Sequence, residues 1–197
     1  DNRFISERVN QLRKWNINFV QADILNNKII SDYCKDADII HHLAGITLVP
    51  KVKNESNLEQ EKLITKVGVE GTQNILDAMS ANSKIILPST HVVYEGLKDL
   101  KNDIKENEET CPVLAYAKSK DLNEKQLINS RKKFVILRLG SVYGYSTDTA
   151  RIDIMPNLFS KIASQNGNLK LFAGGRQVKS LVPLIDVARC FKFIEER

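Results

Sequence analysis

A tyrosine and a lysine four residues apart, Tyr116 and Lys120 in the stretch AYAKSK, form the pair in this sequence that is best suited to chemistry. The stretch is predicted to be helical, so the two side chains share one face of a helix. A phenol has an ordinary pKa of about 10, and a nearby ammonium group lowers it by stabilising the phenolate. Such a pair can move a proton to or from a sugar or alcohol hydroxyl group. The alternative is a surface tyrosine beside a solvated lysine.

A threonine at the end of a predicted strand favours the catalytic interpretation. Thr90 follows the apolar stretch SKIILPS, and its hydroxyl could hydrogen-bond a substrate oxygen opposite Tyr116. A threonine after a strand is more often a turn or cap residue. The two features together, each where the predicted sheet puts a site, are less easily explained by chance.

The elements that would position these residues alternate between short apolar runs and helical patterns. We predict strands at 16–22, 36–44, 83–89 and 133–140, and helices at 6–15, 27–34, 57–81, 115–130 and 152–166. This alternation predicts a parallel sheet covered on both faces, in an α/β, doubly wound, Rossmann-like fold. Ligands of such sheets bind at the carboxyl ends of the strands. Those ends are predicted at Asp23, Leu43 to Gly45, Ser89 to Thr90 and Leu139 to Ser141.

Composition excludes several other classes of protein. The chain has 197 residues, of which 42% are hydrophobic and 27% charged, with no apolar run long enough to span a bilayer and no visible signal peptide. Three widely spaced cysteines argue against a disulfide framework or a zinc site and favour a reducing cytoplasm. The net charge of +5 comes without a stripe of basic and aromatic residues, so we expect no nucleic-acid partner and no membrane partner.

Seven segments in order, spanning nearly the whole chain, resemble the extended short-chain dehydrogenase/reductase family, the NAD-dependent nucleotide-sugar epimerases and dehydratases. The segments are FVQADILN, DIIHHLAG, GVEGTQNIL, PSTHVVYEG, YAKSK, ILRLGSVYG and GGRQVKSLVPLIDVA. The resemblance implies a Rossmann-like NAD-binding domain over residues 1–150 and part of a smaller substrate-binding region over 151–197. The family's glycine-rich phosphate loop would lie upstream of Asp1, so we expect this chain to be part of a longer protein and to bind NAD poorly alone.

The resemblance also implies roles for individual residues. Tyr116 would be the general acid/base, Lys120 would bind the nicotinamide ribose and lower the tyrosine pKa, and Thr90 would orient the substrate hydroxyl. Cofactor contacts are implied at Asp1, Asn2, Asp23, Ile24, Leu43, Ala44, Gly45, Lys120, Leu139 and Ser141, and substrate contacts at Thr47, Thr90, His91, Ser141 and Lys179. An acidic residue at position 1 favours NAD over NADP, because a carboxylate repels a 2′-phosphate. A homodimer through the helices near 57–81 and 115–130 is implied as well.

Departures from the family pattern bear on the reaction. Gly68 and Ser141 stand where asparagine is frequent, and Lys179 where arginine is frequent, which leaves the sugar and the nucleotide open. Dehydratases of the family follow the active-site threonine with Asp-Glu, whereas His91 and Val92 follow Thr90 here. We therefore expect a nucleotide-sugar epimerase that oxidises a sugar hydroxyl transiently. A 4-keto reductase or 4,6-dehydratase of the same family, and a catalytically inactive NAD-binding or scaffold protein, are the alternatives. An RNA-binding Rossmann-like protein has only the basic charge in its favour.

Overall fold

The computed structural model describes residues 2–47, 58–99, 101–145 and 152–197, and the chain divides into two compact units. One unit is Ala22–Leu139. The other combines the segment up to Gln21 with Gly140–Arg197. The predicted division at residue 150 is a division by function, and it remains a prediction.

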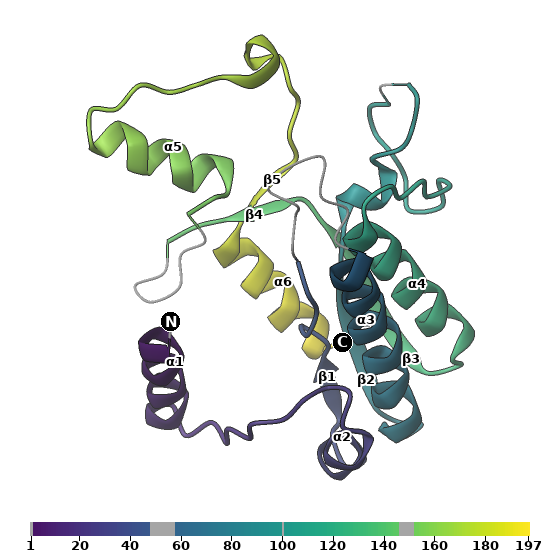
Figure 1. Cartoon of the computed structure of the whole chain (residues 1–197). Coiled ribbons are helices and arrows are strands. Elements are labelled where there is room, and N and C mark those ends of the chain that lie inside the picture. The colour runs from purple at the N-terminus through teal and green to yellow at the C-terminus, as the bar shows by residue number, and fades with distance from the viewer. Residues whose placement is uncertain (1, 48–57, 100, 146–151) are drawn as a thin grey trace. The chain divides into compact units, whose positions relative to one another are not determined.

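The Ala22–Leu139 unit is built on a three-stranded parallel sheet in the order β1 (Ile39–His41), β2 (Lys84–Thr90), β3 (Lys133–Leu139). The crossovers are α3 (Leu58–Ala78) and α4 (Ala115–Asn129), which lie side by side on the same face of the sheet (Figure 1). Neighbouring parallel strands joined through helices on one face are what right-handed crossovers produce. The Rossmann-like α/β class predicted from the sequence is confirmed.

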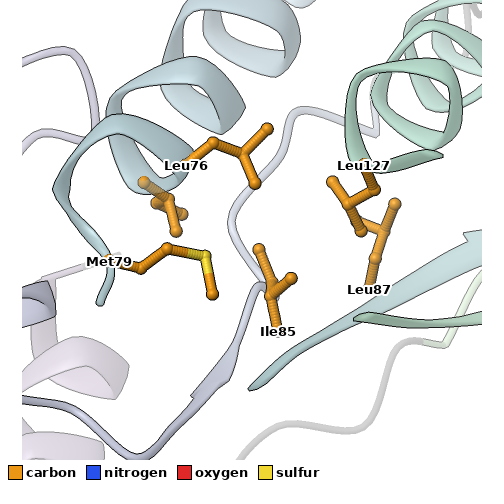
Figure 2. Close-up of a cluster of buried hydrophobic side chains, with 6 residues drawn as sticks. Leu76, Met79, Ile85, Leu87 and Leu127 are labelled. Atoms are coloured by element: carbon orange, nitrogen blue, oxygen red, sulfur yellow. The ribbon is translucent and has the colours of Figure 1, made fainter. Parts of the chain in front are cut away.

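The core of this unit lies between β2 and its two crossover helices. Figure 2 shows Leu76 from α3, Met79 directly after it and Leu127 from α4 directed toward Ile85 and Leu87 of β2. Ile85, Leu87 and Leu127 are fully buried. The helix α2 (Asn27–Cys34) adds partly buried side chains to the same cluster. The strand whose carboxyl end carries Thr90 is therefore the most firmly packed element of the unit.

The second unit pairs two short parallel strands, β4 (Ser141–Tyr143) and β5 (Leu181–Pro183), with Ser141 opposite Leu181. Its other elements are three helices and a 3-10 turn: α1 (Asn2–Lys14), α5 (Met155–Ser164), α6 (Leu184–Glu195) and η2 (Phe172–Gly175). The strand β4 was not predicted as a separate element. In the part of the chain that the structure describes, no helix combines the length and apolar character needed to cross a membrane.

The strand predicted at 16–22 is wrong. Asn16 has a left-handed backbone (φ 58°), and the Ile17 N–H donates to Leu12 O over 3.0 Å, so these residues terminate α1 instead of starting a strand. Ile17 and Phe19 are 47% and 41% exposed. No strand among the described residues pairs with this segment, and an apolar run without a partner for its backbone groups does not become a strand.

The other predicted strands and helices are confirmed, the helix at 27–34 with the predicted ends and the rest with ends shifted by one or more residues. The strand predicted at 36–44 is only three residues long, β1, because pairing with β2 stops at His41. The first helix begins at Asn2, four residues earlier than predicted, and the helix predicted at 152–166 is α5.

A matched pair of substitutions on α4 tests this packing. We expect Leu127→Ala to lower the free energy of unfolding by about 2–5 kcal/mol, because it opens a cavity in the core. Ile128→Ala, next along the helix at a side chain that is 57% exposed, should change it by less than about 0.5 kcal/mol. Urea unfolding of both variants gives the two values, and equal losses would contradict the assigned orientation of α4.

Candidate active site

Lys120 is a buried cation held against the end of β2. Its side chain lies on α4 with only 6% of the residue exposed, and Nζ donates a hydrogen bond to Pro88 O over 2.8 Å. Burial lowers the pKa of Lys120 to about 8, and the charge of Glu124 opposes that shift. At neutral pH Lys120 therefore remains mostly an ammonium group, in a place where its field is poorly screened by water.

Thr90 ends the same strand, two residues beyond Pro88. It is 7% exposed, and its Oγ1 accepts a 3.3 Å hydrogen bond from the Val92 N–H, which starts the 3-10 turn η1 (His91–Tyr94). Thr90 therefore does cap the turn that follows its strand, as a threonine in this position often does. Because the hydroxyl accepts in this bond, its own hydrogen can still donate to an oxygen elsewhere.

Tyr116 is partly buried in the first turn of α4, one turn before Lys120. The start of this helix has no side-chain cap of its own. Instead, Oε1 of Glu95, which directly follows η1, accepts hydrogen bonds from the backbone N–H groups of Val113 and Leu114. Glu95, which follows η1, therefore fixes where α4 begins. Its hydrogen bonds link the turn that starts at Thr90 to the helix that carries Tyr116.

His91 is tied to the neighbouring strand. Its Nδ1 donates to Leu139 O over 3.0 Å, which brings together a predicted substrate residue from the end of β2 and a predicted cofactor residue from the end of β3. Nδ1 is thereby engaged by the backbone, so only Nε2 of this ring can serve a ligand.

A cavity of about 490 Å³ brings together four of the predicted cofactor residues, Asp23, Ile24, Leu43 and Ala44. The loop on its Asp23 side is held in place from two directions. Asp23 Oδ1 accepts from the Leu25 N–H over 2.9 Å, and the Asn74 amide of α3 donates to Ile24 O over 3.0 Å.

A glycine in α3 permits this loop to pack closely against the helix. A Cβ added at Gly71 would lie 2.8 Å from Cγ2 of Ile24, closer than real Cβ contacts. Within the segment GVEGTQNIL, Gly71 and Asn74 therefore hold Ile24 in its place in the cavity wall.

Behind the cavity, a chain of buried polar groups joins β1 to both crossover helices. His42, which is 1% exposed, is within 2.8 Å of Thr72 Oγ1 through its Nε2. In the orientation that satisfies its neighbours, the Asn123 amide donates to Gly68 O and Ser119 O and accepts from the Thr72 hydroxyl. The His42 Nε2–H then donates to Thr72, and Nδ1 is an acceptor that has no partner among the described residues.

Comparison with known proteins identifies the family. A family model described as the NAD-dependent epimerase/dehydratase family matches residues 2–197. The chain belongs to this family. The epimerase/dehydratase domain thus accounts for almost the entire sequence, and the resemblance seen in its motifs is confirmed.

Solved structures share the fold of this epimerase/dehydratase chain. A UDP-glucuronic acid 4-epimerase from Bacillus cereus, in complex with UDP-4-deoxy-4-fluoro-glucuronic acid and NAD, matches with a TM-score of 0.80 at 24% identity over 97% of this chain and 60% of its own. A dTDP-glucose 4,6-dehydratase from Streptomyces venezuelae with NAD bound matches with a TM-score of 0.69 at 22% identity, over 88% and 52%. A UDP-glucose 4-epimerase from Thermotoga maritima matches with a TM-score of 0.69 at 19% identity, over 88% and 57%. The chain spans between about half and three fifths of these proteins.

One departure from the epimerase/dehydratase pattern has a structural explanation. A Cβ at Gly68 would lie 1.9 Å from Ser119 Oγ and 3.3 Å from its Cβ, so a side chain at position 68 would force the Ser119 side chain of α4 to move. The Asn123 amide, arriving from α4, bonds the backbone at this crossing. We have no equivalent explanation for Ser141 or Lys179.

The residues of the Ala22–Leu139 unit fit a dinucleotide cofactor. The cavity wall has apolar side chains for an adenine ring, and the buried Lys120 ammonium has three N–H groups, of which one is used on Pro88 among the described residues. The other N–H groups of this ammonium can donate hydrogen bonds to the ribose hydroxyl groups of a cofactor.

Not every predicted site residue is brought together. Gly45 and Thr47 are exposed and follow Ala44 without contributing to the cavity wall. Ser141 and Lys179 belong to the other unit, where the Ser141 N–H donates to Ser180 O over 2.8 Å, next to Lys179. Asn2 is the first residue of α1, and Asp1 lies outside the described residues.

Sequence reasoning missed a buried ion pair beside the site. Glu124, on α4, receives Nε and Nη2 of Arg138 from β3 at 3.0 and 2.6 Å. The available signal was spacing, because Tyr116, Lys120 and Glu124 follow one another at intervals of four and so share one helix face.

Acidification should destabilise the protein through His42. Burial and, second, the charge of Lys120 lower the His42 pKa from 6.5 to about 4. The unfolded chain therefore binds this proton first, and the stability that depends on neutral His42 is complete above pH 6.5 and lost as the pH falls to about 4. The loss amounts to about 3 kcal/mol. We expect His42→Gln, whose Nε2 can still bond Thr72, to reduce the slope of unfolding free energy against pH in this window. The same slope in both proteins would show that another group causes it.

Proposed function

We propose that the protein is an NAD-dependent nucleotide-sugar epimerase. The observation that supports this most strongly is the buried Lys120 ammonium one turn after Tyr116 on α4, at the end of the strand that carries Thr90. Burying a cation costs stability, so a chemical role explains such a position better than a packing role does. Its placement beside a phenol is consistent with a proton-transfer role.

In the proposed reaction, Thr90 donates to the oxygen of the sugar and orients its hydroxyl toward Tyr116. Tyr116 takes the hydroxyl proton as the sugar carbon is oxidised and returns it when the opposite configuration forms. Lys120 stabilises the phenolate form by its charge and donates to ribose hydroxyl groups of the cofactor. NAD, when bound, supplies the chemistry of reversible oxidation at the sugar carbon. Asp23, Ile24, Leu43 and Ala44 would enclose its adenosine part, with Gly45 and Leu139 alongside.

The two residues after Thr90 favour epimerisation over dehydration. His91 and Val92 occupy the positions where a dehydratase needs carboxyl groups to eliminate water. In this chain His91 Nδ1 donates a hydrogen bond to Leu139 O, and the Val92 N–H donates one to Thr90 Oγ1. Within the threonine turn itself, residues 91–94 provide no acid for elimination.

The function is tested by incubating the full-length protein with NAD and a panel of UDP-, GDP- and dTDP-sugars. The products are separated by chromatography, and their masses are measured by mass spectrometry. An isobaric product is expected. A product lighter by one water would make the protein a dehydratase, a reduced product formed only with an added reductant would make it a keto-sugar reductase, and no turnover of any sugar would favour the inactive scaffold.

Tyr116→Phe isolates the proton transfer. We expect it to lower turnover of the active sugar by about 10²- to 10⁴-fold with NAD affinity unchanged, because the ring remains and only the hydroxyl is lost. Tyr33→Phe, at a side chain that is 56% exposed, serves as the control. Turnover of Tyr116→Phe close to that of the native protein would show that another group moves the proton.

We also propose that the protein is a homodimer through the outward faces of α3 and α4. Leu63 and Leu122 are 47% and 40% exposed on these faces, amid charged residues. Paired helices with exposed leucines can bury a second apolar stripe against a second copy. The three free cysteines, Cys34, Cys111 and Cys190, are consistent with a cytoplasmic location, which stays a prediction.

Sedimentation tests the dimer. The full-length protein should sediment as a dimer at micromolar concentration, and Leu122→Glu should weaken association at least about tenfold by burying a charge. Leu171→Glu, on a leucine of the other unit that is 61% exposed, should leave association unchanged. A native protein that is monomeric at this concentration would contradict the proposal.

A further inference from the structure

Glu124 is a buried carboxylate whose two oxygen atoms are both held. The residue is 2% exposed. Arg138 forms a two-pronged contact with it, through Nε to both oxygens and Nη2 to Oε2, and the Ser89 hydroxyl donates to Oε1. The position of this carboxylate is therefore fixed by α4, β2 and β3 together.

The Arg138 side chain reaches further than Glu124. Its Nη1 donates to the Tyr94 hydroxyl and to Glu106 O, the latter over 2.9 Å. The guanidinium group thus joins the carboxylate to η1 and to the loop that leads from Thr90 toward Tyr116. An arginine bonded on all sides in this way does not move easily, which holds the carboxylate in place.

Lys120 and Glu124 face the same short stretch of β2. They are four residues apart on α4, so their side chains are neighbours on one helix face. Lys120 bonds Pro88 O, and Glu124 bonds the hydroxyl of the next residue, Ser89. An ammonium and a carboxylate therefore lie one helix turn apart in a region shielded from water, where charges act strongly on one another.

Other titratable groups surround this pair. His42 at the end of β1 is neutral near pH 7, because burial and the Lys120 charge lower its pKa to about 4. Arg138 from β3 and Tyr94 from η1 contact the Glu124 side of the pair, and Tyr116 precedes Lys120 by one turn. Asp121, also buried on α4, is engaged by Lys125 and Thr110. Among these groups, Glu124 is the anion that acts on Lys120.

We propose that Glu124 is a positioning residue for the reaction: its carboxylate, clamped by Arg138 and Ser89, is the buried counter-charge that keeps Lys120 an ammonium group. The inference rests on the proposed function for its catalytic consequence. The counter-charge itself does not depend on that function, because Lys120 and Glu124 share one face of α4 and bond neighbouring residues of β2.

The physical reason is a balance between burial and attraction. Burial pushes Lys120 toward its neutral amine, and the carboxylate one turn away holds the proton on it. Without that carboxylate, Lys120 would lose its charge at a lower pH, and with it the ability to stabilise a phenolate. Arg138 weakens the attraction between Glu124 and Lys120, because its positive charge is bonded to the same carboxylate.

The test is a direct titration of Lys120 in the cofactor-free full-length protein. Lysine labelled with carbon-13 at the ε position reports each ammonium group by NMR, and Lys120→Arg identifies the Lys120 signal. Glu124→Gln, which keeps the shape and can still accept hydrogen bonds, is compared with Asp121→Asn, which removes a buried carboxylate from the same helix. Arg138→Gln removes the competing cation.

We expect Glu124→Gln to lower the Lys120 pKa by about one unit, Asp121→Asn to change it by less than about a third of that, and Arg138→Gln to raise it. Shifts in opposite directions cannot come from general loosening of the fold. If Glu124→Gln does not fold, as its thermal melt will show, the double variant Glu124→Gln/Arg138→Gln, which leaves no unpaired guanidinium group buried, is compared with Arg138→Gln instead, and the Lys120 pKa should be lower in the double variant. No shift in either variant, or equal shifts in Glu124→Gln and Asp121→Asn, would overturn the proposal.

Activity supplies a second readout once a turned-over sugar is known. The alkaline limb of kcat/KM should move to lower pH in Glu124→Gln by the same interval as the NMR titration. An NMR shift without any turnover would uphold the counter-charge and refute the proposed enzyme. Turnover with an unmoved alkaline limb and an unmoved NMR titration would uphold the enzyme and refute the counter-charge.

Discussion

Keeping an ammonium group charged out of water is the constraint on which the rest of the site depends. Lys120 is placed where burial works against its charge, so its surroundings must compensate. A carbonyl oxygen at Pro88 and a carboxylate at Glu124 do so, and both partners stay fixed only if β2 and α4 are packed rigidly together. The fully buried Ile85, Leu87 and Leu127 provide that rigidity between the same two elements.

Polar contacts, in addition to the hydrophobic core, join the elements near the site. Arg138 connects β3, α4 and η1 through one guanidinium group, and Glu95 connects η1 to the start of α4. Each of these contacts restricts Thr90, Tyr116 or Lys120 relative to the others. The arrangement suits a reaction in which small displacements of the proton-transfer group cost a large part of the rate.

Sequence reasoning succeeded where the signal was local and failed where it depended on a distant partner. The Tyr116–Lys120 spacing, the apolar run ending at Thr90 and the periodicity of α3 are local, and the structure has them in the predicted elements. The segment at 16–22 has a strand-like composition, yet strand formation requires a paired neighbour, which composition does not reveal. Glu124 was not singled out from the sequence, because its burial is decided by Arg138 and Ser89 from other elements.

A deuterium atom on the sugar carbon that carries the reacting hydroxyl distinguishes epimerisation from the alternative reactions. The full-length protein would convert such a labelled nucleotide sugar in ordinary water, and mass spectrometry and NMR would locate the label in the product. We predict an isobaric product with deuterium on the same carbon in the opposite configuration, since the only atom exchanged with Tyr116 is the hydroxyl proton. Loss of the label to water, or its appearance on a different carbon with loss of water, would contradict it.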